Sequence, residues 1–311
     1  MDTPLKGTHL KSMESITPYW VILIGIFAVS CSSIFIKFAA APPIVTAFYR
    51  MLFTVVILTP AVVRKLNSNQ NFISFSMKQL GVSSLAGVFL ALHFAFWITS
   101  LEYTSITSST VLVTLQPMFV MFGGYLLYGE TIGYRSLLGA LIATCGGIIL
   151  GYGDMNFGSQ ALLGDGFALA GSVFVACYLL IGRNMRKELD LLPYTYIVYL
   201  SATLVLLLGN EVFTNQPLTG YPLSTWGWFV ALAVVPNLLG HSIFSWALRY
   251  VKATVVSVSI LGEPVGASLL SYIIWNQIPA ALQVAGGILI IIGLIIFILS
   301  ATVPIVSRRL D

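Results

Sequence analysis

Several ionisable side chains lie inside long apolar runs of the sequence, where a charge needs a partner or a task. Glu263 is the clearest case, because it lies near the middle of such a run and is followed at once by Pro264. A charge at the centre of a bilayer costs on the order of 2.5–3.5 kcal/mol, so Glu263 is expected to face a cavity or a partner. Pro264 should kink the helix and free a carbonyl beside it. Glu263 could then bind a substrate amine or a proton, and a structural hydrogen bond is the alternative.

Two basic residues, Lys37 and Arg50, also lie within apolar runs, near the ends of the first two. We expect both in the outer third of a membrane. An arginine is well suited to bidentate binding of a carboxylate, and Thr46 and Thr54 share the helix face of Arg50. The alternative is that one or both side chains extend to the membrane interface without a functional role.

Two pairs of polar residues with helical spacing form a further candidate set. His93 and Trp97 are four residues apart, as are Asn237 and His241, so each pair shares one helix face. Histidine titrates near neutral pH and could carry a proton, although a buried, hydrogen-bonded histidine is the simpler interpretation. The remaining candidates for a cavity wall, with packing as the alternative, are Tyr178 and Tyr199.

The composition identifies the class of protein that must position these residues. Of the 311 residues, 58% are apolar and 8% are charged, and the mean hydropathy is +0.93. A soluble domain has about 45–50% apolar and about 25% charged residues. These values exclude a soluble enzyme, a disordered chain and a nucleic-acid binder. They predict an all-α polytopic membrane protein.

Ten apolar stretches are long enough to cross a bilayer, which takes about 20 residues. They are continuous rather than alternating, which argues against a β-barrel. We expect the ten helices at 19–39, 44–63, 79–100, 105–127, 134–152, 162–182, 193–212, 224–247, 254–275 and 279–303.

The distribution of Lys and Arg between loops predicts the orientation. With the N-terminus in the cytoplasm, the loops on that side contain nearly all of the Lys and Arg. The opposite loops contain Glu102, Asp154 and Glu211 but no Lys or Arg. By the positive-inside rule, both termini are expected to be cytoplasmic. The expected organisation is therefore a cytoplasmic tail at 1–18, helices 1–5 at 19–152, helices 6–10 at 153–303, and a second cytoplasmic tail at 304–311.

The second half of the sequence repeats the first. An offset of 147 residues places Leu101-Glu102-Tyr103 on Leu248-Arg249-Tyr250, Gln116-Pro117 on Glu263-Pro264, and Tyr128-Gly129-Glu130 on Trp275-Asn276-Gln277. Gln116 is thus the counterpart of Glu263, and Pro117 should kink its helix as Pro264 does. Five helices per half is an odd number, so the second half should enter the membrane from the opposite side. Such inverted repeats are typical of secondary transporters.

Small residues in the fifth and tenth spans predict close contacts between helices rather than chemistry. They are Gly139, Ala143, Gly146, Gly286 and Gly293.

These repeated motifs resemble the EamA domain of the drug/metabolite transporter superfamily. The resemblance rests on Leu101-Glu102-Tyr103-Thr104-Ser105, Gln116-Pro117, Gly129-Glu130 and a Gly-rich fifth span, with a second copy through Glu263-Pro264 and Gly286-Gly287. It covers about residues 20–300 and implies ten helices around a central cavity, with transport of small metabolites that are often amino acids. Gln116 stands where the family commonly has Glu, and Gln277 stands where the first half has Glu130.

The function expected from these patterns is secondary active or facilitative transport of small metabolites by alternating access. Export of amino acids is the leading hypothesis, with Glu263 facing an amine or proton and Arg50 a carboxylate. Lipophilic cations or another metabolite such as a nucleotide-sugar are alternatives, and a passive channel ranks below them. The sequence has no phosphate-binding glycine loop, metal-ligand spacing or hydrolase motif, so we expect no enzyme activity, cofactor or metal.

The expected partners are a small-molecule substrate and the lipid bilayer, without nucleic acid, and a homodimer is left open. The short N-terminal tail favours a bacterial plasma membrane.

Overall fold

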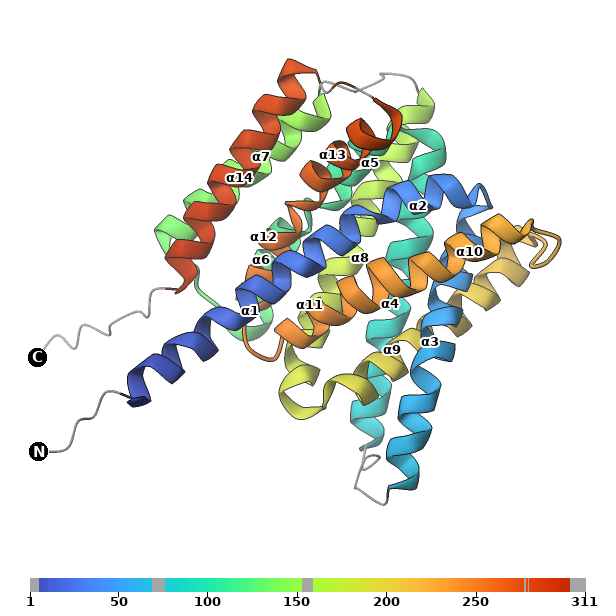
Figure 1. Cartoon of the computed structure of the whole chain (residues 1–311), viewed down its shortest axis with the longest axis horizontal. Coiled ribbons are helices and arrows are strands. Elements are labelled where there is room, and N and C mark those ends of the chain that lie inside the picture. The colour runs from blue at the N-terminus through green and yellow to red at the C-terminus, as the bar shows by residue number, and fades with distance from the viewer. Residues whose placement is uncertain (1–5, 69–75, 153–158, 277, 279, 303–311) are drawn as a thin grey trace, which may run out of the picture.

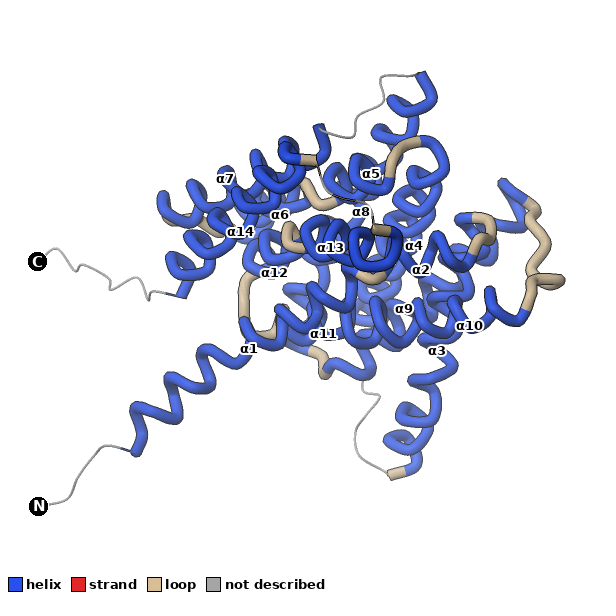
Figure 2. Tube along the Cα trace, turned by 45° about the horizontal axis from the view of Figure 1, so that its top comes forward, coloured by secondary structure: helices blue, strands red, loops and turns tan. Residues whose placement is uncertain are grey.

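The structure is a computed structural model that describes residues 6–68, 76–152, 159–276, 278 and 280–302. Within these residues every regular element is a helix (Figures 1 and 2). The first half contains α1 (Lys6–Ser30), α2 (Ser32–Ala39), α3 (Pro43–Asn67), α4 (Met77–Tyr103), α5 (Ile106–Val113), α6 (Gln116–Tyr128) and α7 (Tyr134–Tyr152). The second half contains α8 (Ser159–Glu188), α9 (Leu191–Gly209), α10 (Leu223–Leu232), α11 (Ser242–Ala247), α12 (Ala253–Ile260), α13 (Glu263–Trp275) and α14 (Ala281–Thr302), with π-helical segments η1 (Asn210–Thr214) and η2 (Ala233–His241).

Nine helical segments among the described residues are long and apolar enough to cross a membrane. The tenth expected span corresponds to α7, whose apolar part, Tyr134–Leu150, is shorter. The protein is therefore an all-helical, multi-pass membrane protein. The span expected at 19–39 corresponds to Pro18–Ala39, within which the chain leaves the regular helix at Cys31, between α1 and α2.

The internal repeat is visible in the helix boundaries themselves. Adding the offset of 147 residues to α5 and α6 gives the bounds of α12 and α13. Each pair is separated by a two-residue interruption, at Thr114-Leu115 and at Leu261-Gly262. The residues that end α6 and α13, Gly129 and Asn276, are also related by the offset, and both have left-handed backbones with φ of 60° and 52°. Glycine and asparagine tolerate that conformation best.

The last helices of the two halves, α7 and α14, lie side by side (Figure 1). A Cβ added to Gly139 would lie 2.8 Å from the carbonyl oxygen of Gly293, and one added to Gly146 would lie 2.7 Å from that of Gly286. The expected contact between small residues is therefore confirmed. Gly139 precedes Gly146 in α7, whereas their partners come in the reverse order in α14, Gly293 after Gly286. These equivalent helices therefore run in opposite directions, as inverted repeats require.

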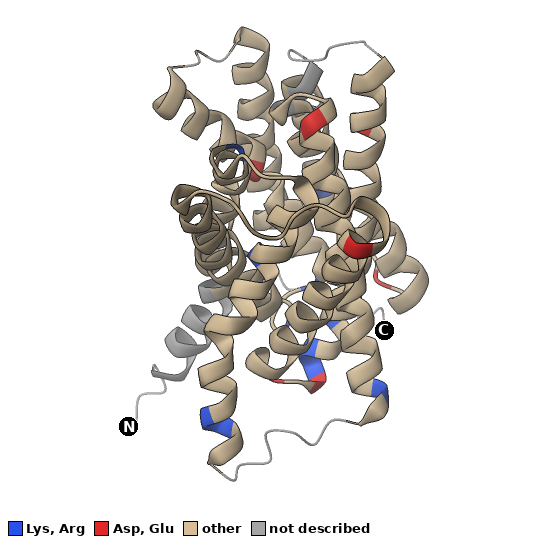
Figure 3. Cartoon of the chain, turned by 90° about the vertical axis from the view of Figure 1, so that its right-hand side faces the viewer, with Lys and Arg blue, Asp and Glu red and all other residues tan. Residues whose placement is uncertain are grey.

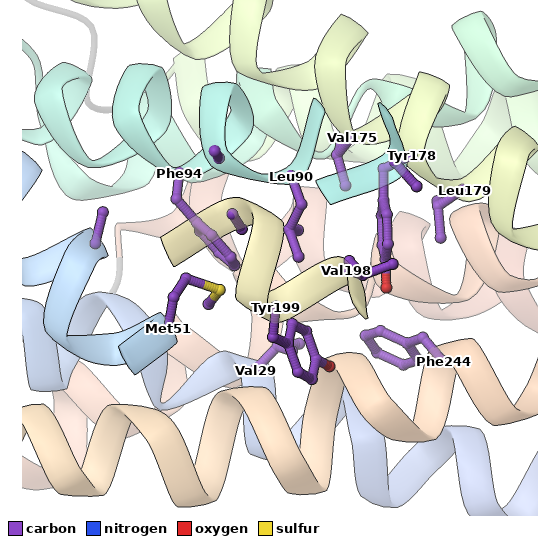
Figure 4. Close-up of a cluster of buried hydrophobic side chains, with 14 of the residues drawn as sticks. Val29, Met51, Leu90, Phe94, Val175, Tyr178, Leu179, Val198, Tyr199 and Phe244 are labelled. Carbon is purple, nitrogen blue, oxygen red and sulfur yellow. The ribbon is translucent and has the colours of Figure 1, made fainter. Parts of the chain in front are cut away.

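The principal core joins helices of both halves around one apolar cluster. In Figure 4, Leu90 and Phe94 of α4 converge with Tyr199 of α9, Val29 of α1 and Phe244 of α11, all of them buried. Tyr49 and Met51, which flank Arg50 in α3, belong to the same cluster. Figure 3 shows that most of the Lys and Arg segments gather toward one end of the molecule.

Candidate substrate-binding site

The interrupted helices bring Gln116 and Glu263 into the interior. Gln116 is the first residue of α6 and Glu263 the first residue of α13, and each is followed by the proline predicted to disturb its helix, Pro117 or Pro264. A proline is tolerated in the first turn of a helix, where its missing N–H would have no partner in any case. Both side chains are buried, with Glu263 8% exposed, and α6 packs against α12 while α5 packs against α13.

Arg50 lies at the centre of this region, held from three sides. Its Nε donates to Asn237 Oδ1 at 2.5 Å and its Nη1 donates to Ser32 Oγ at 2.8 Å. The guanidinium lies 4.1 Å from the ring centroid of Phe94, a cation–π distance. Arg50 is 0% exposed, so the alternative that its side chain extends to a membrane interface is wrong. The remaining nitrogen, Nη2, is buried without a hydrogen-bond partner.

Asn237 is placed by an unusual stretch of backbone. It lies in η2, a π-helical segment that contains Pro236 and ends at His241, and π-helical turns often occur at functional sites. The Asn237 amide nitrogen donates to Thr54 Oγ1 at 3.0 Å, which leaves its oxygen for Arg50. Asn237 therefore orients the guanidinium.

Two histidines and a tryptophan complete the polar wall. His93 Nδ1 lies 2.9 Å from the carbonyl oxygen of Gly171, and the imidazole stacks on Trp97 with ring centroids 5.9 Å apart. The rings of His93 and His241 are 6.2 Å apart. The indole nitrogen of Trp97 is buried without a hydrogen-bond partner. It is the second unpaired donor at this site, after Arg50 Nη2.

A small cavity, here called the central cavity, lies between these side chains. Its volume is about 30 Å³, which is room for a water molecule but not for a metabolite. In the part of the chain that the structure describes, Arg50 and Glu263 form no ion pair within 4.0 Å, although both line this cavity. The polar groups around it come from both halves of the chain: Ser32, Arg50, His93, Gln116, His241 and Glu263.

A larger cavity, here called the vestibule, lies beside the central cavity and has a volume of about 550 Å³. The two cavities are lined by consecutive residues of the same helices. Ser32, Trp97 and Glu263 line the central cavity, whereas the residues that follow each of them line the vestibule. Only a thin layer of side chains therefore separates the two. The polar lining of the vestibule includes Ser33, Lys37, Glu102, Ser105, Thr110 and Ser271.

Three candidates from the sequence lie outside the central cavity. Lys37 lines the vestibule, and its ammonium lies 4.7 Å from the ring centroid of Trp275. Tyr178 and Tyr199 line neither cavity; their hydroxyls pair with Ser245 Oγ at 2.7 Å and Ser242 Oγ at 2.9 Å. Six of the other seven candidates line the central cavity, and the seventh, Asn237, contacts Arg50. Their roles in transport stay predictions.

Ser32 and Phe94, which both contact the Arg50 guanidinium, were not predicted from the sequence. The run Ser30-Cys31-Ser32-Ser33, polar residues inside an apolar span, was a signal for the first. Phe94 gave none, because an apolar residue in an apolar span is unremarkable. Among the described residues, no three His, Cys, Asp or Glu side chains are grouped to hold a metal ion.

The model of the EamA-like transporter family matches residues 16–152 and again residues 162–299. The chain belongs to the EamA-like transporter family. It therefore carries two EamA domains, is a member of the drug/metabolite transporter superfamily, and is a transporter rather than an enzyme. The resemblance seen in the sequence motifs is confirmed.

Individual EamA-like relatives are distant. An uncharacterised transporter of Archaeoglobus fulgidus is 23% identical over 266 residues, which cover 85% of this chain and 90% of the relative. The pseudopaline exporter CntI of Pseudomonas aeruginosa is 24% identical over 227 residues, which cover 72% of this chain and 76% of the exporter. A crystal structure with 19% identity matches with a TM-score of 0.71, covering 90% of this chain and 98% of that one, and shows the shared fold.

Proposed function

We propose that this protein exports small polar metabolites by alternating access, with zwitterionic amino acids as the leading substrate class. The observation that carries the proposal is that two residues of opposite charge, one from each half, line the same cavity. Arg50 comes from the first half and Glu263 from the second, and both line the central cavity without forming an ion pair within 4.0 Å. A molecule with a carboxylate and an amine complements both groups.

The central cavity is too small for such a substrate in this conformation, so binding requires the helices around it to separate. We expect the helices to separate at the thin layer between the central cavity and the vestibule. There, Ser32 and Glu263 line the central cavity, and the next residues, Ser33 and Pro264, line the vestibule. With the orientation expected from the positive-inside rule, the vestibule faces away from the cytoplasm. The structure then represents a state closed toward the cytoplasm, in a plasma membrane.

The name of the Pseudomonas relative supports export of a metabolite as the direction and cargo type. Lipophilic cations are the second candidate, favoured by the aromatic rings of Trp97 and Phe244, which line the central cavity with Glu263. The buried guanidinium of Arg50 opposes a purely cationic substrate, which is why zwitterions rank first.

The test is transport by the purified protein in proteoliposomes. A panel of labelled amino acids and small amines is offered, with and without unlabelled substrate inside and with and without a pH gradient. We expect saturable uptake of at least one zwitterion, stimulated by internal substrate. Glu263→Gln and Arg50→Lys should each reduce it by roughly tenfold or more. The first removes the negative charge and the second removes the bidentate donor geometry of a guanidinium, and a hydrogen bond to a charged group contributes about 1.5–3 kcal/mol.

Matched controls are Glu211→Gln and Arg64→Lys, which alter exposed side chains far from the central cavity in the fold. These variants should transport like the parent protein. Full transport by Glu263→Gln at every pH would remove Glu263 from the mechanism. Uptake of amines but of no zwitterion would transfer the proposal to lipophilic cations.

A further inference from the structure

The two ends of the transport pathway differ. At the vestibule end, a large cavity reaches nearly to Glu263. At the opposite end, polar contacts join α6 of the first half to α8 of the second. Arg183 Nη2 and Nε both donate to Glu130 Oε1, at 3.1 and 3.3 Å, and the two side chains are only 16% and 13% exposed.

The position of Glu130 is fixed by the end of α6. Gly129 adopts the left-handed conformation, and the Glu130 N–H donates to the carbonyl oxygen of Gly124 at 3.1 Å. The Gly129 N–H also donates to the carbonyl oxygen of Tyr125, at 3.0 Å, so the two hydrogen bonds close the end of the helix around Gly129. These bonds fix the main chain of Glu130, from which its carboxylate reaches Arg183.

The ion pair lies on a closely packed surface between α6 and α8. Tyr128 OH donates to the carbonyl oxygen of Leu180 at 2.8 Å, and a Cβ added to Gly123 would clash with the Leu180 side chain. Opening a pathway at this end requires α6 to move away from α8, and that movement breaks the ion pair together with these contacts.

The equivalent position in the second half cannot form such a pair. The repeat places Trp275 on Tyr128 and Gln277 on Glu130. Trp275 contacts the exposed Lys37 by a cation–π interaction, and a glutamine has no charge to pair. Two halves with identical contacts would make the two open states equal in energy. The charge difference between Glu130 and Gln277 makes them unequal.

We propose that the Glu130–Arg183 pair is a one-sided latch that holds this end closed and so favours the state open at the vestibule. The latch rests on the proposed alternating access. Its loss should shift the ratio of the two states by roughly three- to tenfold, because a partly buried pair with two hydrogen bonds lies between exposed and fully buried pairs in strength.

The test measures cysteine accessibility and needs no substrate. In the full-length chain with Cys31, Cys145 and Cys177 replaced by alanine, single reporters are introduced as Ser245→Cys, between Tyr178 and the latch end, or Ser271→Cys, in the vestibule. The labelling rate with a water-soluble maleimide reports how often each end opens. Glu130→Gln, the residue type found at the equivalent position, should raise the rate at 245 by three- to tenfold and lower it at 271.

The matched control is Asp190→Asn. It breaks the Arg249–Asp190 ion pair, 3.0 Å long, which lies at the same end but joins two parts of the second half and is largely exposed. It should leave both rates unchanged. The charge swap Glu130→Arg with Arg183→Glu should restore the parent rates.

The outcomes separate the latch from the transport mechanism. Unchanged rates in Glu130→Gln, or the same change in Asp190→Asn, would overturn the latch while leaving alternating access intact. Faster labelling at both positions would indicate general loosening and would also overturn it. A rise at 245 with an unchanged rate at 271 would contradict alternating access itself. Size-exclusion profiles that match the parent show that each variant is folded.

Discussion

Asn237 is predicted to stabilise the fold through its contact with the Arg50 side chain, and removing it tests the arrangement of the site. The perturbation is Asn237→Ala, alone and combined with Arg50→Met, which keeps an unbranched apolar stem but removes the guanidinium and its charge. Because Arg50 is 0% exposed, bulk solvent does not reach the guanidinium to replace the lost partner. The cost of Asn237→Ala should therefore depend strongly on whether Arg50 is present.

The magnitude follows from the two shortest of the hydrogen bonds that Asn237 makes with side chains; the third, to Met51 Sδ, is 3.9 Å long. The bond from Arg50 Nε at 2.5 Å involves a charged donor, and such bonds contribute about 1.5–3 kcal/mol. The bond to Thr54 Oγ1 at 3.0 Å is neutral and contributes about 1 kcal/mol. Asn237→Ala should then cost about 2.5–4 kcal/mol in the parent protein, but only about 1 kcal/mol with Arg50→Met. The coupling energy is the difference, about 1.5–3 kcal/mol.

The assay is a double-mutant cycle on the free energy of unfolding, measured by SDS titration in mixed micelles. Thr225→Val provides a control cycle, because the Thr225 hydroxyl donates to the carbonyl oxygen of Ala39 at 2.9 Å, and neither residue contacts Arg50 in the hydrogen bonds described. Thr225→Val and Arg50→Met should be additive within about 0.5 kcal/mol. A coupling below about 0.5 kcal/mol between Asn237 and Arg50 would refute the arrangement described for the guanidinium.

Two further predictions concern packing and the second unpaired donor. Gly146→Ala should lower the free energy of unfolding by about 1–3 kcal/mol, because the added methyl group forces α7 away from α14. The control, Gly166→Ala, has open space around it and should not destabilise the protein. Equal melting temperatures for the two variants would contradict the glycine contact. Trp97→Phe removes the buried, unpaired indole N–H, so it should leave the melting temperature unchanged or higher yet raise the KM for a carboxylate substrate roughly fivefold or more. A lower melting temperature with an unchanged KM would show that Trp97 only fills space.

Much of the architecture follows from local features of the sequence. The prolines at 117 and 264, related by the repeat, mark helices that the structure interrupts just before Gln116 and Glu263. The glycines at 139, 146, 286 and 293 predicted the contact between α7 and α14. These features are readable because a missing N–H or a missing Cβ acts within one turn or at one contact, whatever surrounds it.

The surroundings of single polar residues were harder to predict. Hydropathy placed Arg50 near the end of a span, with the membrane interface as one alternative, yet it is fully buried against Asn237, 187 residues away. From the sequence, Tyr178 and Tyr199 were candidates for a cavity wall, but the hydroxyl of each forms a hydrogen bond with a serine of α11. A periodic pattern gives the face of one helix, not the helix that will cover it.

The sequence by itself determined a multi-pass helical transporter with two repeats, because apolar length, basic loops and a fixed offset are properties of the chain alone. The tertiary structure decided which charges meet: that Arg50 and Glu263 share one small cavity, that Lys37 lines a separate vestibule, and that Glu130 pairs with Arg183. Each of these contacts joins residues far apart in the sequence. They depend on how all the helices pack at once, and no local pattern records that packing.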